Sequence, residues 1–253
     1  GCMSLASLTH GEGKPLVLVH GWGMHAGVWM PLLPRLEKRW RVTMIELPGH
    51  GESDFLEGDV HEWARALLES APESATWLGW SLGAMVSLAA AATAPERFEA
   101  LVLAGGTPRF VREPGWECGM QKRLLDSFAN ELFSSPERTM LRFLGLQVRG
   151  AENERETLKQ LRSGVRQRPQ AGREALRCGL DLLLQTELRP HLSGLRVPSL
   201  WLFGEKDTLV SAKTADHVRR LQPLARTHVI RSAGHAPFLS HPEACLKALE
   251  EAA

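Results

Sequence analysis

The fold of this 253-residue chain is decided by the stretch ATWLGWSLGAMVSLAAAATA at residues 75–94. Its first residues form a short apolar run typical of a buried strand, and residues 82–94 have a helical pattern. The turn between them matches G-x-S-x-G, with Gly79 and Gly83 on either side of Ser81. A strand-turn-helix setting indicates that Ser81 is a nucleophile exposed above a sheet. The alternative is a glycine-rich turn in which Ser81 only caps the helix.

Similar short apolar runs, most of them ended by Gly or Pro, recur on both sides of this stretch and alternate with helical patterns. Strands that alternate with helices predict an α/β fold with a mainly parallel sheet and right-handed crossovers. We expect further strands at Pro15–His20, Arg41–Glu46, Ala100–Gly105, Ser199–Gly204 and Arg226–Ile230, and helices at His61–Ser70, Ala212–Leu221 and Pro242–Ala252.

The alternation stops between residues 111 and 190, where the sequence has helical periodicity and no convincing strand. We therefore expect a core made of residues 1–110 and 191–253, with a helical cap inserted at 111–190. Residues 121–177 hold twelve Lys or Arg against seven Asp or Glu, so the basic part of the chain lies here. Two apolar helical stripes are expected in the cap: Leu124, Leu125, Phe128, Leu132 and Phe133, and then Met140, Leu141, Phe143, Leu144 and Leu146.

Composition excludes several classes of protein. A formal net charge of +1 gives no overall field that would favour nucleic acid or a membrane surface as partner. No apolar run reaches the roughly 18 residues that a membrane helix needs, and the N-terminus lacks a signal-peptide pattern. We expect a monomeric cytoplasmic protein without a metal site. Four cysteines, far apart in the sequence, are interpreted as reduced thiols: Cys2, Cys118, Cys178 and Cys245.

A serine hydroxyl needs a positioned base and an orienting carboxylate before it attacks a carbonyl. Asp207 lies in the loop after the strand at residues 199–204, where Glu205 is an alternative. His235 follows the last strand, and His228 and His241 are its alternatives. We assign the carboxylate to Asp207 and the base to His235, because each then follows a strand and the chain order is Ser, Asp, His.

The oxyanion of such a reaction needs two N–H donors. The segment His20-Gly21-Trp22-Gly23 follows the first apolar run, and its glycines allow a turn that points an N–H at the substrate. We assign the two donors to the backbone amides of Trp22 and Leu82. Alternatively, Trp22 is a core or rim aromatic that acts only through its side chain, and both roles are compatible.

Longer motifs carry a family resemblance. They are HGWGM at 20–24, LPGHGES at 47–53, WLGWSLG at 77–83, PER at 95–97, RFL at 142–144 followed by LQ at 146–147, and HAPF at 235–238 with SHP at 240–242. Over nearly its whole length the sequence resembles the α/β-hydrolase superfamily. More narrowly, it is similar to the pimeloyl-[acyl-carrier protein] methyl ester esterases of biotin synthesis. The resemblance implies a cofactor-free serine esterase whose substrate is a pimeloyl methyl ester carried on acyl carrier protein.

The same resemblance implies that basic residues of the cap hold the acidic carrier protein and its phosphopantetheine phosphate. The matching positions are Arg138, Arg142, Arg155 and Lys159, and the last has Lys where the family has Arg. Each pair is four residues apart and would share one helical face. The alternative is a solvated cap surface with ion pairs to Glu137, Glu152, Glu154 and Glu156.

Phe128 and Phe143 are candidates for the lining of the acyl channel together with Trp22, although packing between helices is an equally open role. Three other functions remain open from the sequence. Two are enzymatic, a generalist short-chain esterase and a carbon-carbon bond hydrolase of the same fold. The third is a small-molecule receptor that keeps the fold and signals through movement of the cap.

Overall fold

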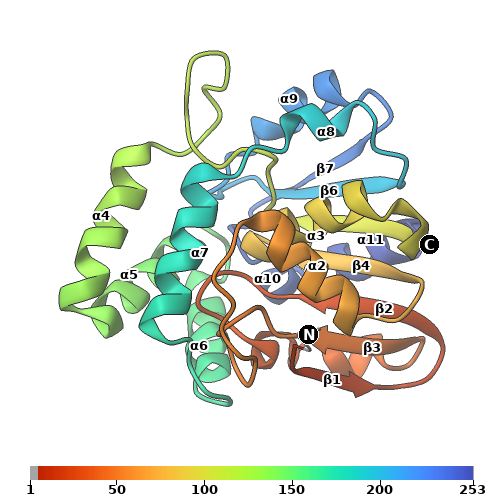
Figure 1. Cartoon of the computed structure of the whole chain (residues 1–253), viewed down its shortest axis with the longest axis horizontal. Coiled ribbons are helices and arrows are strands. Elements are labelled where there is room, and N and C mark those ends of the chain that lie inside the picture. Colours follow the sequence, from red (N-terminus) through yellow and green to blue (C-terminus); the bar gives the residue numbers. More distant parts are fainter. Residues whose placement is uncertain (1–4, 253) are drawn as a thin grey trace.

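The computed structural model describes residues 5–252, and within them the chain forms a seven-stranded sheet (Figure 1). The strands are β1 (Ser7–His10), β2 (Lys14–Val19), β3 (Trp40–Ile45), β4 (Ala75–Trp80), β5 (Phe98–Ala104), β6 (Ser199–Gly204) and β7 (Arg226–Ile230). Their order across the sheet is β1-β3-β2-β4-β5-β6-β7. Only β1 runs antiparallel to its neighbour. The predicted α/β fold with a mainly parallel sheet is confirmed.

The edge strand β1 was not expected from the sequence. It pairs with β3 in the register Ser7 to Ile45, and most of its residues are exposed. An exposed edge strand has no apolar run, so the signal used for the buried strands is missing there. A smaller difference concerns the helix expected at Ala212–Leu221, which begins only at Thr214 because Ser211 forms a turn with Lys213.

Helices cover both faces of the sheet (Figure 1). One apolar layer lies between the sheet and α2, α3, α8 and α9, and the other lies between the sheet and η1, α1, α10 and α11. Their bounds are η1 (Ala26–Trp29), α1 (Leu33–Leu36), α2 (Val60–Ser70), α3 (Leu82–Thr93), η2 (Pro95–Arg97), α8 (Arg189–Leu192), α9 (Thr214–Leu221), α10 (Pro237–Ser240) and α11 (Pro242–Ala252).

Two central helices begin in different ways. The α2 helix has a capping box, in which the Asp59 carboxylate accepts from two amides of the first turn and the Glu62 side chain accepts from the Asp59 amide. The α3 helix has no side-chain cap at Ser81. It is almost wholly buried, since its many alanines let it pack closely against the sheet. The start of α3 is therefore determined by tertiary packing, which leaves the serine free for another role.

Four longer helices lie between β5 and β6 in the chain: α4 (Lys122–Ser134), α5 (Pro136–Val148), α6 (Glu154–Val165) and α7 (Arg173–Gln185). They form a separate group beside the sheet, green to teal in Figure 1. The expected apolar stripes are only partly correct. Leu125, Phe128 and Leu132 are buried, but Phe133 is 57% exposed and Leu141 is 53% exposed.

Three cysteines are buried free thiols, namely Cys118, Cys178 and Cys245, while Cys2 lies outside the described residues. No helix between residues 5 and 252 is both long enough and apolar enough to cross a membrane. In the same part of the chain, no group of three or more His, Cys, Asp or Glu side chains is arranged to hold a metal ion.

Candidate active site

Ser81 lies in a sharp turn between β4 and α3, with φ of 57° and ψ of −116°. Such torsions are strained for a residue other than glycine and persist only when the surroundings enforce them. Gly79 and Gly83 provide the space, because a Cβ on Gly79 would lie 2.7 Å from Ala84 Cα and one on Gly83 would collide with the His20 carbonyl oxygen. The Ser81 side chain makes no capping hydrogen bond. The alternative in which this serine only caps a helix is therefore wrong.

Three side chains, each placed after a different parallel strand, form a hydrogen-bonded row that we call the Ser-His-Asp row. Ser81 Oγ lies 2.8 Å from His235 Nε2, and His235 Nδ1 lies 2.7 Å from Asp207 Oδ2. The other carboxylate oxygen of Asp207 accepts hydrogen bonds from the Leu209 and Val210 amides, at 2.8 and 3.0 Å. The carboxylate is thus fixed, and it holds the imidazole with Nε2 toward the serine.

The alternative residues considered from the sequence lie elsewhere. Glu205 is exposed, and its carboxylate accepts from the Ser232 amide. His228 is exposed on β7. His241 is hydrogen-bonded to the Ser240 hydroxyl at 2.7 Å. The geometry therefore favours the assigned carboxylate and base over these alternatives.

The loop after β2 passes directly over the serine. A Cβ on Gly21 would lie 3.3 Å from Ser81 Cβ. Within residues 5–252 the Trp22 amide donates to no backbone or side-chain acceptor, and Leu82 is the first residue of α3, whose amide has no partner in its own helix. Two amides without a partner among the described residues thus lie in the segments next to Ser81, and an oxyanion would need two such donors.

Two buried histidines hold this loop in place. The Gly23 amide donates to His50 Nε2, and the Leu47 amide donates to His20 Nε2, both at 3.0 Å. Burial lowers the pKa of His50 to about 4, and burial together with the neighbouring His50 lowers the pKa of His20 to about 3. Both imidazoles are therefore neutral near pH 7 and can accept these hydrogen bonds. The sequence patterns had assigned no role to either side chain.

A buried ion pair joins the end of β3 to the segment between α6 and α7. Arg168 donates to both oxygens of Glu46, at 2.8 and 2.6 Å, and the Ala26 and Glu52 amides donate to the same carboxylate. Burial raises the Glu46 pKa, but the hydrogen bonds from Arg168 and the two amides outweigh it and lower the pKa to about 2. The pair was missed from the sequence. The one available signal was a charged residue, Glu46, at the end of an apolar strand.

Three aromatic side chains, which we call the aromatic row, extend from the loop into the cap helices. Trp22 and Phe143 pack edge to face at 4.8 Å between ring centroids, and Phe143 and Phe128 do so at 5.6 Å. The Trp22 indole N–H donates to the Leu176 carbonyl at 2.8 Å. Trp22 is therefore a buried aromatic and also has a free amide, so its two predicted roles are compatible in this geometry. Phe128 and Phe143 connect α4 and α5 and are almost fully buried.

The end of α5 contacts the loops that carry the Ser-His-Asp row. The His235 amide donates to the Gln147 carbonyl at 2.8 Å, and the Thr208 hydroxyl donates to the Leu146 carbonyl at 2.9 Å. The Gln147 side-chain amide is buried, and neither of its polar atoms has a partner among the described residues. A displacement of α5 would therefore also displace the loop that carries the His235 imidazole.

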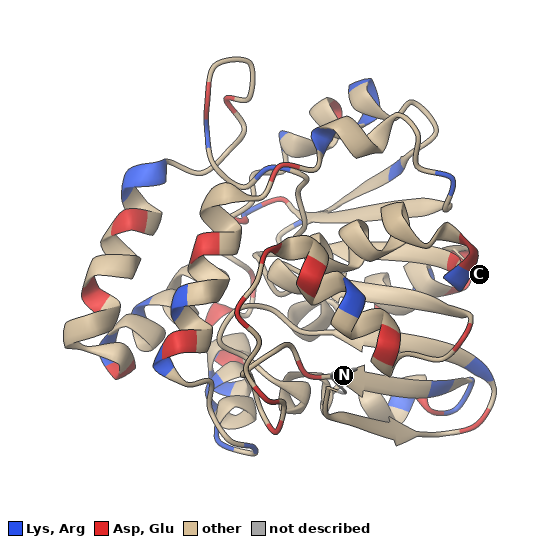
Figure 2. Cartoon of the chain, viewed as in Figure 1, with Lys and Arg blue, Asp and Glu red and all other residues tan. Residues whose placement is uncertain are grey.

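The four cap cations that were predicted as carrier contacts differ in surroundings. Arg142 donates to the Glu131 carboxylate at 2.6 Å, and its guanidinium lies 4.6 Å from the centre of the Phe128 ring. Figure 2 shows basic and acidic residues along α4 to α7. Among the described residues, none of the four carboxylates that were considered as ion-pair partners forms a salt bridge with an Arg or Lys, and Glu152 lies 3.4 Å from His241 Nε2. The other three predicted contacts are exposed: Arg138, Arg155 and Lys159.

A serine, a histidine and an aspartate that meet at the ends of parallel strands, in the chain order Ser, Asp, His, are typical of an α/β hydrolase. The α/β hydrolase fold family matches residues 14–242. Two similar curated relatives are pimeloyl-[acyl-carrier protein] methyl ester esterases. The relative from Photobacterium profundum is 43% identical and 96% of each chain is covered, and that from Methylococcus capsulatus is 45% identical with 98% of each covered.

The chain therefore belongs to the α/β hydrolases and, within them, to the family of pimeloyl-[acyl-carrier protein] methyl ester esterases. This confirms the resemblance inferred from the motifs. Among solved structures, an esterase from Exiguobacterium antarcticum matches with a TM-score of 0.86 and 20% identity, covering 98% of this chain and 94% of that one. At that identity the likeness supports the fold alone.

Proposed function

We propose that the chain hydrolyses the methyl ester of a pimeloyl group carried on acyl carrier protein, releases methanol and leaves the thioester intact, as a step of biotin synthesis. The single observation that supports this most is the Ser-His-Asp row, buried in a chain whose relatives are named for that reaction. The row places the Ser81 hydroxyl beside His235 Nε2 and His235 Nδ1 beside the Asp207 carboxylate, and the mechanism uses these two contacts.

In the first half-reaction, Ser81 Oγ attacks the ester carbonyl while His235 Nε2 takes the hydroxyl proton. Asp207 stabilises the imidazolium that forms. The carbonyl oxygen becomes an oxyanion and accepts hydrogen bonds from the Trp22 and Leu82 amides. When the tetrahedral intermediate collapses, His235 gives its proton to the departing methoxy group. Methanol leaves, and the pimeloyl carbonyl is bonded to the serine.

In the second half-reaction, water replaces methanol and the steps run in reverse. His235 removes a proton from water, and the hydroxide adds to the acyl-enzyme carbonyl with the same two amides as oxyanion donors. Collapse breaks the bond to Ser81 Oγ, which regains a proton from His235. The product is a carboxylic acid that ionises at neutral pH. Every proton passes through one imidazole, so this route uses no metal ion or organic cofactor.

We assign residues 111–190 the role of a cap over a core of residues 1–110 and 191–253. Contacts from α5 and α7 to the loop after β2 support this assignment, because they place cap side chains beside the oxyanion donors. Phe128 and Phe143 would line the apolar channel for the pimeloyl chain. The carrier protein would contact the exposed cations of the cap, which are Arg138, Arg155 and Lys159 together with the partly engaged Arg142.

We also propose that one chain is sufficient for activity and that the protein works in the cytoplasm. The first point is supported by the site itself, because the Ser-His-Asp row and both oxyanion donors come from a single chain. The second is supported by the three buried cysteines, which remain unpaired as in a reducing compartment.

Genetic complementation tests this function. A strain that lacks its biotin-pathway esterase should grow without biotin when it produces this chain, and should not grow when it produces the Ser81→Ala variant at equal abundance. Methanol release from purified methyl pimeloyl-acyl carrier protein should show the same contrast. Growth supported equally by both forms, or no methanol from the intact protein, would contradict the proposal. A much higher kcat/KM for a short free ester than for the carrier-bound ester would favour a generalist esterase.

A further inference from the structure

The loop after β2 and the loop after β3 each hold a buried histidine that is bonded to the backbone of the other loop. His20 directly follows β2, and its Nε2 accepts a hydrogen bond from the Leu47 amide just after β3. His50 lies in the loop after β3, and its Nε2 accepts from the Gly23 amide in the loop after β2. The ring centroids are 5.3 Å apart, and both side chains are fully buried. We call these two residues the histidine pair.

The second nitrogen of each ring is also engaged. A backbone amide can only donate, so Nε2 of both rings is an acceptor without a proton, and a neutral imidazole then has its proton on Nδ1. Nδ1 of His20 therefore donates to the Gly21 carbonyl oxygen at 2.8 Å. Nδ1 of His50 donates to the Pro48 carbonyl oxygen at 3.0 Å. All four ring nitrogens have a partner, so each imidazole is fixed in one orientation and one tautomer.

The bond from His20 to the Gly21 carbonyl oxygen acts on the peptide group that contains an oxyanion donor. That oxygen and the Trp22 N–H belong to the same peptide group, which is trans. In a planar trans peptide the C=O and the N–H point in opposite directions. The Gly21 oxygen also accepts from the Met24 amide at 3.2 Å. Because the oxygen is held on one side, the Trp22 N–H is turned to the other side, away from His20.

The bond from Gly23 to His50 holds the next peptide group of the loop. The Gly23 N–H belongs to the peptide that begins with the Trp22 carbonyl, so the histidine pair holds both peptide groups that flank the Trp22 Cα. Gly23 has φ of +74°, and a Cβ there would collide with Cε of Met140 from the cap. This close packing leaves the peptide little space to move. The loop therefore has little freedom to turn the Trp22 amide once both histidine bonds are made.

We propose that His20 and His50 are positioning residues that together orient the Trp22 amide toward the oxyanion and so raise kcat without binding the substrate. This rests on the proposed function, in which Trp22 is an oxyanion donor. Donors that are fixed before the reaction stabilise an oxyanion best, because no reorganisation is needed when the charge forms. The bond to the Gly21 oxygen also polarises that peptide group and strengthens its N–H as a donor. Both effects act on the transition state.

Leucine substitutions remove the contribution of each ring separately. His20→Leu frees the Gly21 carbonyl oxygen, and His50→Leu leaves the Gly23 amide without its acceptor. In each variant kcat for a short-chain nitrophenyl ester should fall about 10- to 100-fold, which is less than the roughly 10²- to 10³-fold loss for removal of a whole donor. KM should be nearly unchanged. The double variant should lose little more than the worse single variant, because both bonds act on the same amide.

An alkylboronic acid gives a second readout at the oxyanion itself. It forms a tetrahedral adduct with the serine hydroxyl, and one of its oxygens takes the position of the oxyanion, as in a transition-state analogue. Its Ki should rise in proportion to the loss of kcat in both leucine variants. A purely structural role would lower the free energy of unfolding but would leave kcat and Ki of the folded protein unchanged.

His25 provides the matched control, because it is a third buried histidine of the same loop. Its Nδ1 accepts from the Gly27 amide at 3.0 Å, and its Nε2 donates to the Val165 carbonyl at 2.9 Å. Neither bond involves the peptide groups around Trp22. His25→Leu should therefore lower the free energy of unfolding, as the other leucine variants do, and should leave kcat and Ki nearly unchanged.

Two polar variants of His50 keep the proposal testable if a leucine variant fails to fold. His50→Gln has a side-chain oxygen that can take the place of Nε2, so it should retain most of the kcat. His50→Asn is too short to reach the Gly23 amide and should lose kcat as His50→Leu does. Equal kcat in these two variants would overturn the proposal on its own.

The remaining outcomes separate the histidine pair from the proposed function. Folded His20→Leu and His50→Leu variants with unchanged kcat and Ki overturn the proposal, and so does a change in KM alone or an equal loss of kcat in His25→Leu. An intact chain that hydrolyses the short ester but releases no methanol from the carrier-bound ester overturns the proposed function, while the same variants still decide on the histidine pair. An intact chain that hydrolyses neither ester overturns both.

Discussion

The sheet and the segment between β5 and β6 both bury apolar side chains, yet they position functional residues in different ways. In the sheet, Ser81, Asp207 and His235 each follow a strand, so the topology alone brings them to one edge. In the cap segment, exposure depends on how helices rest on one another, and Phe133 and Leu141 remain exposed in spite of their apolar character. Changes in the first region should abolish chemistry, and changes in the second should alter which substrate is accepted.

The largest effect is expected at the nucleophile. Ser81→Ala removes the covalent route and leaves only oxyanion and binding effects, so kcat should fall by about 10⁴- to 10⁶-fold. The loss should be equal for a free short-chain ester and the carrier-bound ester. Steady-state kinetics measures it, with Ser134→Ala on the exposed surface of α4 as the matched control. A variant that keeps more than about a tenth of the turnover would remove Ser81 from this role.

The orienting carboxylate comes next. Asp207→Asn should lower kcat by about 10⁴-fold, because the amide can no longer hold the imidazole in the productive tautomer. Glu205→Gln, two residues earlier, is the matched control and should change kcat little, since that carboxylate contacts the Ser232 amide and not His235. Kinetic measurement of both variants on the same ester separates them. The opposite ranking would transfer the role to Glu205.

The ion pair that joins the two regions should matter for stability. Arg168→Met leaves the buried Glu46 carboxylate without its cation, with only the Ala26 and Glu52 amides as partners, which should lower the free energy of unfolding by about 3 kcal/mol. Arg166→Met, at an exposed position, should cost less than about 0.5 kcal/mol. Urea unfolding measures both. Adding Glu46→Gln to Arg168→Met should recover part of the loss, whereas strictly additive effects would show that the pair is not coupled.

The smallest effect is expected at the cap surface, and it should depend on the substrate. Arg138→Glu/Arg155→Glu should lower kcat/KM for the carrier-bound ester by about tenfold or more, through weaker attraction of an acidic partner. Hydrolysis of a free short-chain ester should be nearly unchanged. The matched control is Arg65→Glu/Arg220→Glu, which makes the same change in charge at positions outside the cap. Equal losses on both substrates would indicate a disrupted cap, and no loss on either would leave these cations without a role in docking.

Residues that follow strands could be located from the sequence because a parallel sheet aligns the ends of its strands. The turn around Ser81 has its own motif, and His235 and Asp207 each come directly after an apolar run. The edge strand β1 could not be found in this way, since its residues are mostly exposed and its partner β3 is distant in sequence.

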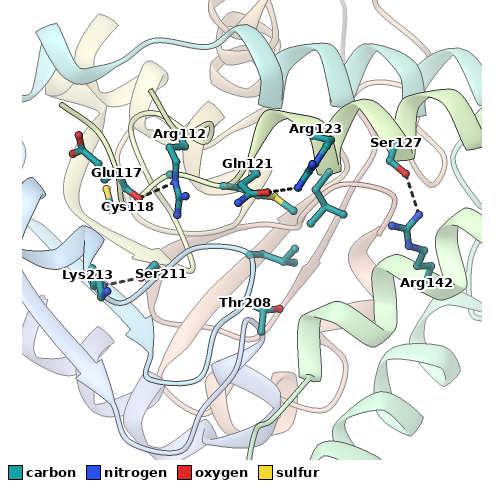
Figure 3. Close-up of a pocket in the computed structure, with 14 residues that line it drawn as sticks. Arg112, Glu117, Cys118, Gln121, Arg123, Ser127, Arg142, Thr208, Ser211 and Lys213 are labelled. Atoms are coloured by element: carbon teal, nitrogen blue, oxygen red, sulfur yellow. Dashed lines mark hydrogen bonds between the residues drawn. The ribbon is translucent and has the colours of Figure 1, made fainter. Parts of the chain in front are cut away.

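Contacts between the two regions were not predictable from local patterns. Glu46 and Arg168 are 122 positions apart, and only the placement of the segment after α6 brings them together. A cleft of about 550 Å³ beside α4 likewise combines Arg112, near the start of the cap segment, with Lys213 of the core (Figure 3). Pattern and composition located the excess of basic residues in this segment. They could not determine which of its cations would already be engaged, as Arg142 is with Glu131.

The most direct test is the mass of the carrier protein after reaction. It shows whether the buried serine of the core hydrolyses the methyl ester of a substrate that the cap selects. Methyl pimeloyl-acyl carrier protein treated with the intact chain should become lighter by one methylene group, as a methyl ester becomes an acid, and should keep both the arm and its acyl group. The Ser81→Ala variant should leave the mass unchanged. Loss of the whole acyl group, which would mean thioester cleavage, or an unchanged mass with the intact chain would contradict this function.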